Sequence, residues 1–431
     1  MRVERVRNLE GEWQPPGMGR QPALGFIFIT LVLDILGIGL IVPILPKLIE
    51  NMQGGTLSEG ALTYGFLAAL YAFMQFLCAP LLGSLSDRFG RRPVILLSLL
   101  GGGLDYFLLA FAPDLTWFVI GRIIAGVTGA NFASATAYIA DVSPPEKRAA
   151  NFGLVGAAFG MGFVIGPAIG GWLGHYSFRL PFIVAGCLTL LNWLYGLFVL
   201  PESLKPENRR VFSWKRSNPV GALLALRHYP MVLGLSWTFF LINLAHQVFP
   251  ATWVLYTGYR FDWGPSQVGM SLAFVGVMAA IVQGGLTRKV VPKLGEKRTA
   301  LLGLTISIFS YIAYGLASQG WMVYAIIVWG SLGGLATPAI QGIVSQQVGA
   351  NEQGGVQGSL TSLSSVAGIL GPPLATGLFA YFVGSQAPFL LPGAAFFCAA
   401  LIVVIAMLLM KRVFVLSRKS IMAGDCHLLK S

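Results

Sequence analysis

The fold of this chain is constrained most by twelve apolar segments, each near the ~20 residues that an α-helix needs to cross a lipid bilayer. Of its 431 residues, 55% are hydrophobic and only 11% are charged, whereas soluble domains carry about 25% charged residues. The sequence therefore predicts an all-α polytopic membrane protein with twelve transmembrane helices in two six-helix bundles. The segments fall at about 24–46, 62–84, 93–112, 116–141, 149–174, 181–200, 231–257, 267–287, 298–317, 321–347, 354–377 and 390–411.

Polar stretches divide the chain into five parts. We expect an N-terminal segment at 1–22, bundles at 23–200 and 231–412, a basic linker at 201–230 that is too polar to insert, and a tail at 413–431. The first twenty residues have no apolar core, so we expect no cleaved signal peptide. The two bundles repeat each other weakly: Gly295 follows Gly90, and Gly371-Pro372 follows Gly166-Pro167, by the same 205 residues.

The net charge of +12 is distributed by topology. Lys and Arg gather at the N-terminus, in alternate breaks between apolar segments, and at the C-terminus, whereas the other breaks hold only Lys47, Arg179 and Arg260. Because basic loops remain in the cytoplasm, we predict that both termini are cytoplasmic. This distribution does not indicate nucleic-acid binding. The scattered cysteines have no metal or disulfide spacing, and no constellation of catalytic residues is present, so we expect neither a cofactor nor an enzyme.

A short charged turn runs from Gly83 to Pro93 between the second and third apolar segments. Its charged side chains cannot lie in hydrocarbon, so the turn is expected at the cytoplasmic face. Gly83 and Gly90 allow close helix approach and a left-handed turn. The alternative is a basic turn that only sets orientation. The charged residues are Asp87, Arg88, Arg91 and Arg92.

Two carboxylates and one guanidinium lie deep in apolar segments, where ionisable groups are costly and mark functional sites. Asp34 lies midway along the first segment and Asp105 well inside the third. Apolar surroundings favour the protonated form of a carboxyl group, which suits it to bind and release protons. Arg122, in the fourth segment, stays charged and needs a partner, for which we expect Asp34. The alternative is an ion pair that only holds helices together.

Small residues recur every fourth position in the fifth segment, at Gly162, Gly166 and Gly170, with Pro167 and Gly171 beside them. Such spacing permits close contact between membrane helices, and Pro167 bends the helix. Tight packing is therefore one interpretation. In the second half, five polar side chains are candidates for a substrate cavity, although each can instead be a hydrogen-bonded structural residue. They are Asn243, His246, Gln247, Gln283 and Gln341.

The order Gly-x-Leu-x-Asp-Arg-x-Gly-Arg-Arg resembles the signature loop of major facilitator superfamily transporters, and the run around Gly166-Pro167 resembles the motif of their drug/proton antiporters. Almost end to end, the chain is similar to the tetracycline/proton antiporters of Gram-negative bacteria, most specifically over Ala69–Pro80 and Gly37–Pro43. The likeness implies roles in proton coupling for Asp34, Asp105 and Arg122. It also implies a cytoplasmic latch made of Gly83, Asp87, Arg88, Gly90, Arg91, Arg92 and Asp141.

This resemblance implies a monomeric inner-membrane exporter of an amphipathic drug such as tetracycline, driven by a proton gradient, with a divalent cation carried with the substrate as one option. The chain departs from the family at Ala279 and Ser307, where the relatives carry a histidine and an aspartate of their proton and substrate machinery. His246 is a candidate substitute. A symporter or uniporter for a sugar or other solute, and a receptor with a transporter fold, remain as alternatives.

Overall fold

The computed structural model describes residues 24–129, 131–143, 148–204, 206–209, 230–345 and 353–428. In these residues all regular structure is helical. Eleven helical spans are long and apolar enough to cross a membrane, and a shorter apolar helix, α5 (Leu115–Thr128), precedes α6 (Asn131–Val142). Together they confirm the predicted polytopic fold with twelve membrane-spanning units.

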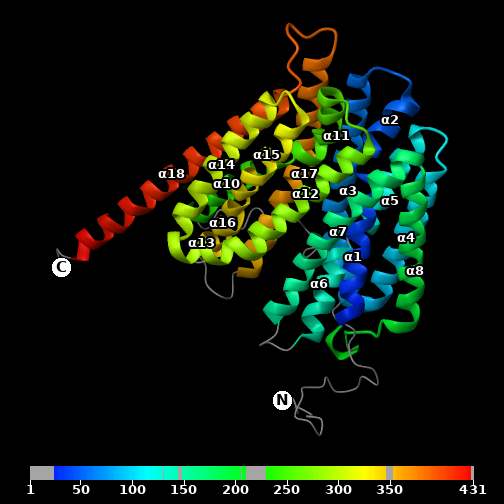
Figure 1. Cartoon of the computed structure of the whole chain (residues 1–431). Coiled ribbons are helices and arrows are strands. Elements are labelled where there is room, and N and C mark those ends of the chain that lie inside the picture. Colours follow the sequence, from blue (N-terminus) through cyan, green and yellow to red (C-terminus); the bar gives the residue numbers. More distant parts are fainter. Residues whose placement is uncertain are drawn as a thin grey trace.

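The first six units form the N-terminal half. They are α1 (Leu24–Ile41) with α2 (Leu45–Gln53), α3 (Leu57–Phe89), α4 (Arg91–Ala110), α5 with α6, α7 (Arg148–Tyr176) and α8 (Leu180–Val199). In Figure 1 this half, blue to green, lies on the right. A short 3-10 helix, η1 (Pro206–Asn208), follows it.

The second six units form the C-terminal half, on the left of Figure 1. They are α10 (Pro230–His246) with α11 (Val248–Phe261), α12 (Pro265–Ala280) with η3 (Ile281–Leu286) and α13 (Thr287–Leu294), α14 (Glu296–Leu316), α15 (Gly320–Gly330) with η4 (Ser331–Leu335) and α16 (Ala336–Ser345), α17 (Gln353–Val383) and α18 (Ala394–Leu428). Two of these helices continue well beyond the predicted spans: α13 extends the eighth to Leu294, and α18 extends the twelfth to Leu428.

Local chemistry explains where α3 begins and ends. The predicted span at 62–84 lengthens because Thr56 and Glu59 form a capping box, in which Thr56 Oγ1 accepts from the Glu59 N–H and Glu59 Oε2 accepts from the Thr56 N–H. Gly90 ends the helix with φ +108°, a backbone region that other residues avoid, and α4 begins at the next residue. The charged turn is therefore a sharp corner between two long helices.

Several spans are interrupted in ways that their apolar sequence did not predict. The seventh breaks at Gln247, because Pro250 lacks an N–H and its ring crowds the carbonyl of His246 four residues earlier. The eighth contains the π-helical stretch η3, and the tenth contains the 3-10 stretch η4 beside it. Such irregular stretches occur often at functional positions of membrane helices.

The two halves pack together at one end of the molecule, opposite to the end that carries Arg88 and Lys289, which we call the basic end. There α3 packs on α17, and α7 packs on α12. Gly65 abuts Thr376, and Ser58 Oγ donates to the carbonyl oxygen of Ala380 at 3.0 Å. We call this region the outer seal.

The halves separate toward the basic end. Along the stretches of α3, α7 and η3 that lie there, a methyl group added at Gly83, Gly160 or Gly284 would meet no atom within 4 Å. In Figure 1 the lower ends of α6 and α13 are well apart. The space between the halves is thus open toward the basic end and closed at the outer seal.

Candidate substrate and proton site

A cavity of about 510 Å³ lies between the two halves, within the range of pockets for drug-sized ligands. The N-terminal half contributes its ionisable and aromatic wall, and the C-terminal half contributes a neutral wall from α11 and α17. The polar and aromatic residues that line it are Asp34, Tyr64, Tyr71, Gln75, Ser98, Asp105, Tyr106, Arg122, Thr128, Phe132, Thr189, Gln247, Thr361, Ser364 and Ser365.

All three predicted coupling residues meet in this cavity, from α1, α4 and α5. Asp105 is only 2% exposed, and its Oδ1 has no hydrogen-bond partner. The charge of Arg122 acts on Asp105, and the Arg122 guanidinium lies 5.9 Å from the ring centre of Tyr71. The Nε of Arg122 is likewise buried without a hydrogen-bond partner. The cavity therefore holds a guanidinium whose hydrogen-bonding capacity is only partly used.

Two glycines bring these groups close together. A methyl group at Gly121 would lie 2.9 Å from Asp105 Oδ1, so only glycine lets α5 press against that carboxyl group. A methyl group at Gly37, one turn from Asp34, would lie 2.8 Å from the Tyr106 hydroxyl. Asp34 also interacts electrostatically with Tyr71 and Tyr106. A cluster of phenol, carboxylate and guanidinium groups results.

In the C-terminal half, the structure brings only one of the five predicted polar candidates to this cavity, Gln247 at the break between α10 and α11. Asn243 donates to the carbonyl of Phe239 in its own helix at 2.9 Å, and His246 is exposed beside Phe249. Gln283 lies in the π-helical stretch and Gln341 in α16, both outside the wall of this cavity.

The C-terminal wall also contains a row of hydroxyl groups on α17 that our sequence reasoning missed. Ser364 and Ser365 line the cavity and donate to the carbonyls of Leu360 and Thr361, at 3.2 and 3.1 Å. Their oxygens keep lone pairs for a ligand. The run of Ser and Thr within an otherwise apolar segment was the available signal.

The glycine motif of α7 joins three helices. Gly162, Gly166 and Gly170 pack against α1 between Ile35 and Leu40, directly after Asp34. On another side of α7, Gly171 abuts Gly269 of α12, across the outer seal. The packing interpretation of this motif is therefore confirmed, and its position links the helix of Asp34 to the contact between the halves.

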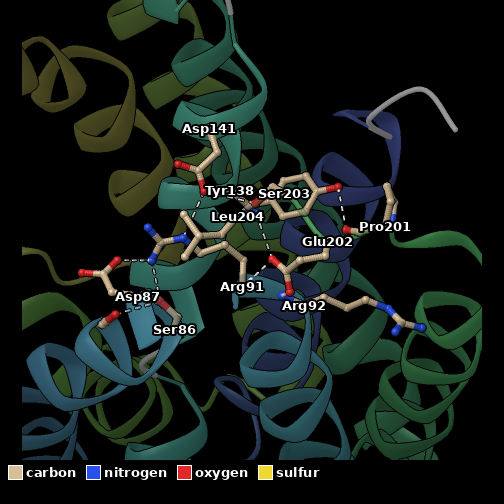
Figure 2. Close-up of polar contacts among 11 residues, drawn as sticks. Ser86, Asp87, Arg91, Arg92, Tyr138, Asp141, Pro201, Glu202, Ser203 and Leu204 are labelled. Atoms are coloured by element: carbon tan, nitrogen blue, oxygen red, sulfur yellow. Dashed lines mark hydrogen bonds and ion pairs between the residues drawn. The ribbon is translucent and has the colours of Figure 1, made fainter. Parts of the chain in front are cut away.

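At the basic end, the charged turn belongs to a network within the N-terminal half (Figure 2). Arg91 bonds to Asp87 Oδ1 at 2.6 Å through Nη1 and to Asp141 Oδ2 at 3.1 Å through Nε. Ser203 Oγ donates to the same Asp141 oxygen at 3.1 Å. Because Arg91 is buried, these charge-assisted bonds hold the ends of α3, α4 and α6 together.

Glu202 completes this network, and our sequence reasoning did not predict it. Its carboxylate accepts from the backbone N–H groups of Arg91 at 2.8 Å, Arg92 at 3.2 Å and Leu204 at 3.0 Å (Figure 2). The first two are donors left free at the start of α4, where a negative charge also favours the helix dipole. A carboxylate directly after the sixth span was the signal in the sequence.

We expect Glu202→Gln to lower the stability of the detergent-purified protein by about 1–3 kcal/mol, because the amide NH₂ would face a half-buried backbone N–H that it cannot bond. Thermal unfolding measures this loss. Glu207→Gln, on the exposed η1, is the matched control and should unfold like wild type. Equal melting temperatures for all three proteins would contradict the capping role.

Comparison with known proteins agrees with this geometry. The sequence profile of the Major Facilitator Superfamily matches residues 27–372 and 293–421. The chain is 43% identical to "Tetracycline resistance protein, class C" of Escherichia coli over 358 residues, which are 83% of this chain and 90% of that protein. It is 30% identical to "Hippocampus abundant transcript 1 protein" of Homo sapiens over 85% of this chain and 75% of that protein.

Among solved structures, the human organic anion transporter MFSD10 (TETRAN) superimposes with a TM-score of 0.69 at 23% identity, over 92% of this chain and 100% of that one. This similarity shows the shared fold. The cavity between two six-helix halves and the fold define a membrane transporter. The chain belongs to the Major Facilitator Superfamily, and within it the sequence is similar to the tetracycline resistance proteins, which confirms the resemblance inferred from its motifs.

Proposed function

We propose that this protein is a proton-coupled exporter of an amphipathic, drug-like compound of the tetracycline type. The observation that carries the proposal is the meeting of Asp34, Asp105 and Arg122 in the wall of one drug-sized cavity. Two carboxylates beside a permanent cation can exchange a proton for a ligand, because the proton and the ligand compete for the same negatively charged groups. The names of the similar proteins support the substrate class.

In the proposed cycle, the protein lies in a bacterial inner membrane with its basic end on the cytoplasmic side. The cavity, open to that side, takes up the ligand, and the halves then rock to open the outer seal. A proton from outside binds Asp34 or Asp105, weakens the attraction to Arg122, and releases the ligand. The protein works as a monomer, and a divalent cation bound to the ligand travels as substrate.

The charged turn takes part in the same rocking motion. In the conformation open to the basic end, Asp87 binds Arg91 of its own half. When that end closes, Asp87 reaches the N-terminus of the α17 span in the other half, where the helix dipole attracts a carboxylate. The turn thus acts as a latch for the outward-facing state.

Proton movement in inverted vesicles with an acid lumen tests the proposal. Addition of tetracycline with Mg²⁺, or of another amphipathic drug, should make the lumen more alkaline, and Asp34→Asn should abolish the response. If no compound in a broad panel moves protons although the protein is folded and inserted, the export function is wrong. Uptake of sugars and organic solutes would then test the symporter alternative.

A further inference from the structure

Tyr64 of α3 makes a hydrogen bond that crosses between the halves in the wall of the cavity itself. Its hydroxyl donates to the carbonyl oxygen of Pro250 in α11 at 2.8 Å. Both residues line the cavity, and the Tyr64 side chain is 8% exposed. The bond therefore stands where the substrate space ends and the outer seal begins.

A second side-chain hydrogen bond across the outer seal lies further out. Ser58 donates to the carbonyl oxygen of Ala380 there, and Ser58 lies about 1.7 helical turns beyond Tyr64 on α3. Gly65, the residue after Tyr64 on α3, packs against Thr376 of α17. Tyr64 is thus the inner and Ser58 the outer bond of this part of the seal, and only Tyr64 also borders the cavity.

The acceptor of the Tyr64 bond depends on the break in the seventh span. Pro250 lies in the first turn of α11, where its missing N–H costs no helical hydrogen bond. The resulting bend places Gln247 and the Pro250 carbonyl on the cavity side. A straight helix would not present this carbonyl in the same way, so the break and the bond belong together.

Tyr64 also lies within the field of the charged cluster, because the charge of Arg122 acts on its hydroxyl group. A ligand or proton that changes the partners of Arg122 therefore changes the environment of the residue that bonds the opposite half. The cavity and the seal share one side chain.

We propose that Tyr64 is a gate residue: its hydroxyl bond to Pro250 keeps the outer end of the cavity closed in the conformation seen here, and this bond breaks before the ligand can leave outward. The purpose of such a gate rests on the proposed transport function. The gate itself can be tested without any substrate.

The test uses Tyr64→Phe, which removes only the hydroxyl, in a full-length protein whose four native cysteines are replaced. A Thr376→Cys reporter lies inside the outer seal, where the native threonine is fully buried, and reacts with a membrane-impermeant maleimide only when the halves part there. We expect labelling from the outer face to become about fivefold faster, because one hydrogen bond of ordinary strength is lost. Unchanged labelling would overturn the proposal.

A second reporter separates gating from general loosening. Gly160→Cys faces the open space toward the basic end. If Tyr64→Phe shifts the protein between two conformations, labelling at 160 stays level or falls as labelling at 376 rises, whereas a loosened fold raises both and overturns the proposal. Ser58→Ala is the matched comparison and should change labelling less than twofold, since water at the rim replaces its bond. The labelling rates are measured without any drug, so they test the gate even if the proposed export function is wrong.

Discussion

Arg122→Gln is expected to reduce drug-dependent proton movement to below about one hundredth of the wild-type rate. The guanidinium lies in the cavity with Asp105, whose carboxyl group is almost fully buried and has an unbonded oxygen. Removing one member of a buried charge pair costs about 3–5 kcal/mol, since the other charge is left without compensation. The carboxyl groups would then no longer change partners during the cycle, and protonation would lose its link to motion.

The measurement is the initial rate of lumen alkalinisation in inverted vesicles with matched protein content. Arg122→Lys keeps the charge but not the planar fork, so we expect partial activity. Arg179→Gln is the control, because Arg179 lies outside the cavity and donates to the carbonyl of Ala112 at 3.4 Å. Wild-type rates for Arg122→Gln would show that the guanidinium is not part of the coupling site.

Gly166→Ala is expected to cost about 1–3 kcal/mol of stability, as other over-packed sites do, and to reduce transport at least tenfold. The added methyl group would lie 2.8 Å from the Gly39 Cα and 2.9 Å from the Leu36 carbonyl oxygen. Both are backbone atoms that cannot turn aside, so α1 and α7 must separate. Because Asp34 precedes this contact on α1, its position in the cavity shifts as well.

Gly160→Ala on the same helix is the matched control. A methyl group there meets no atom within 4 Å, and alanine in a helix is more favourable than glycine by up to about 1 kcal/mol. We therefore expect equal or higher thermal stability and normal transport for Gly160→Ala. If the two alanine variants unfold at the same temperature and transport equally, the close contact of α7 with α1 is not needed for stability or transport.

Length and apolarity were enough to predict the twelve spans, because every backbone polar group in a bilayer must be bonded within a helix. Ionisable groups are rare in apolar segments, so Asp34, Asp105 and Arg122 could be identified as candidate site residues from the sequence. The structure brings these three together in one cavity. The glycine spacing of α7 predicted close packing, but not that it faces both α1 and α12.

Other features depend on atoms far apart in the chain. Of the five polar candidates, Gln247 lines the cavity, whereas Asn243, His246, Gln283 and Gln341 do not, because the side of each helix that meets the other half decides this. Apolar membrane helices show little periodicity from which that side could be predicted. The hydroxyl row of α17 and the carboxylate of Glu202 likewise acquire their roles only from their neighbours.

The sequence by itself determined that this chain crosses a membrane twelve times, with most of its basic residues at one end and three ionisable groups deep in apolar segments of the first half. Hydrocarbon imposes those outcomes locally, segment by segment, through the cost of exposing polar groups. Only the tertiary structure decided which end is open and which polar side chains share the cavity. It also placed the Tyr64 hydroxyl against the Pro250 carbonyl, because that contact requires two helices separated by 186 residues to pack side by side.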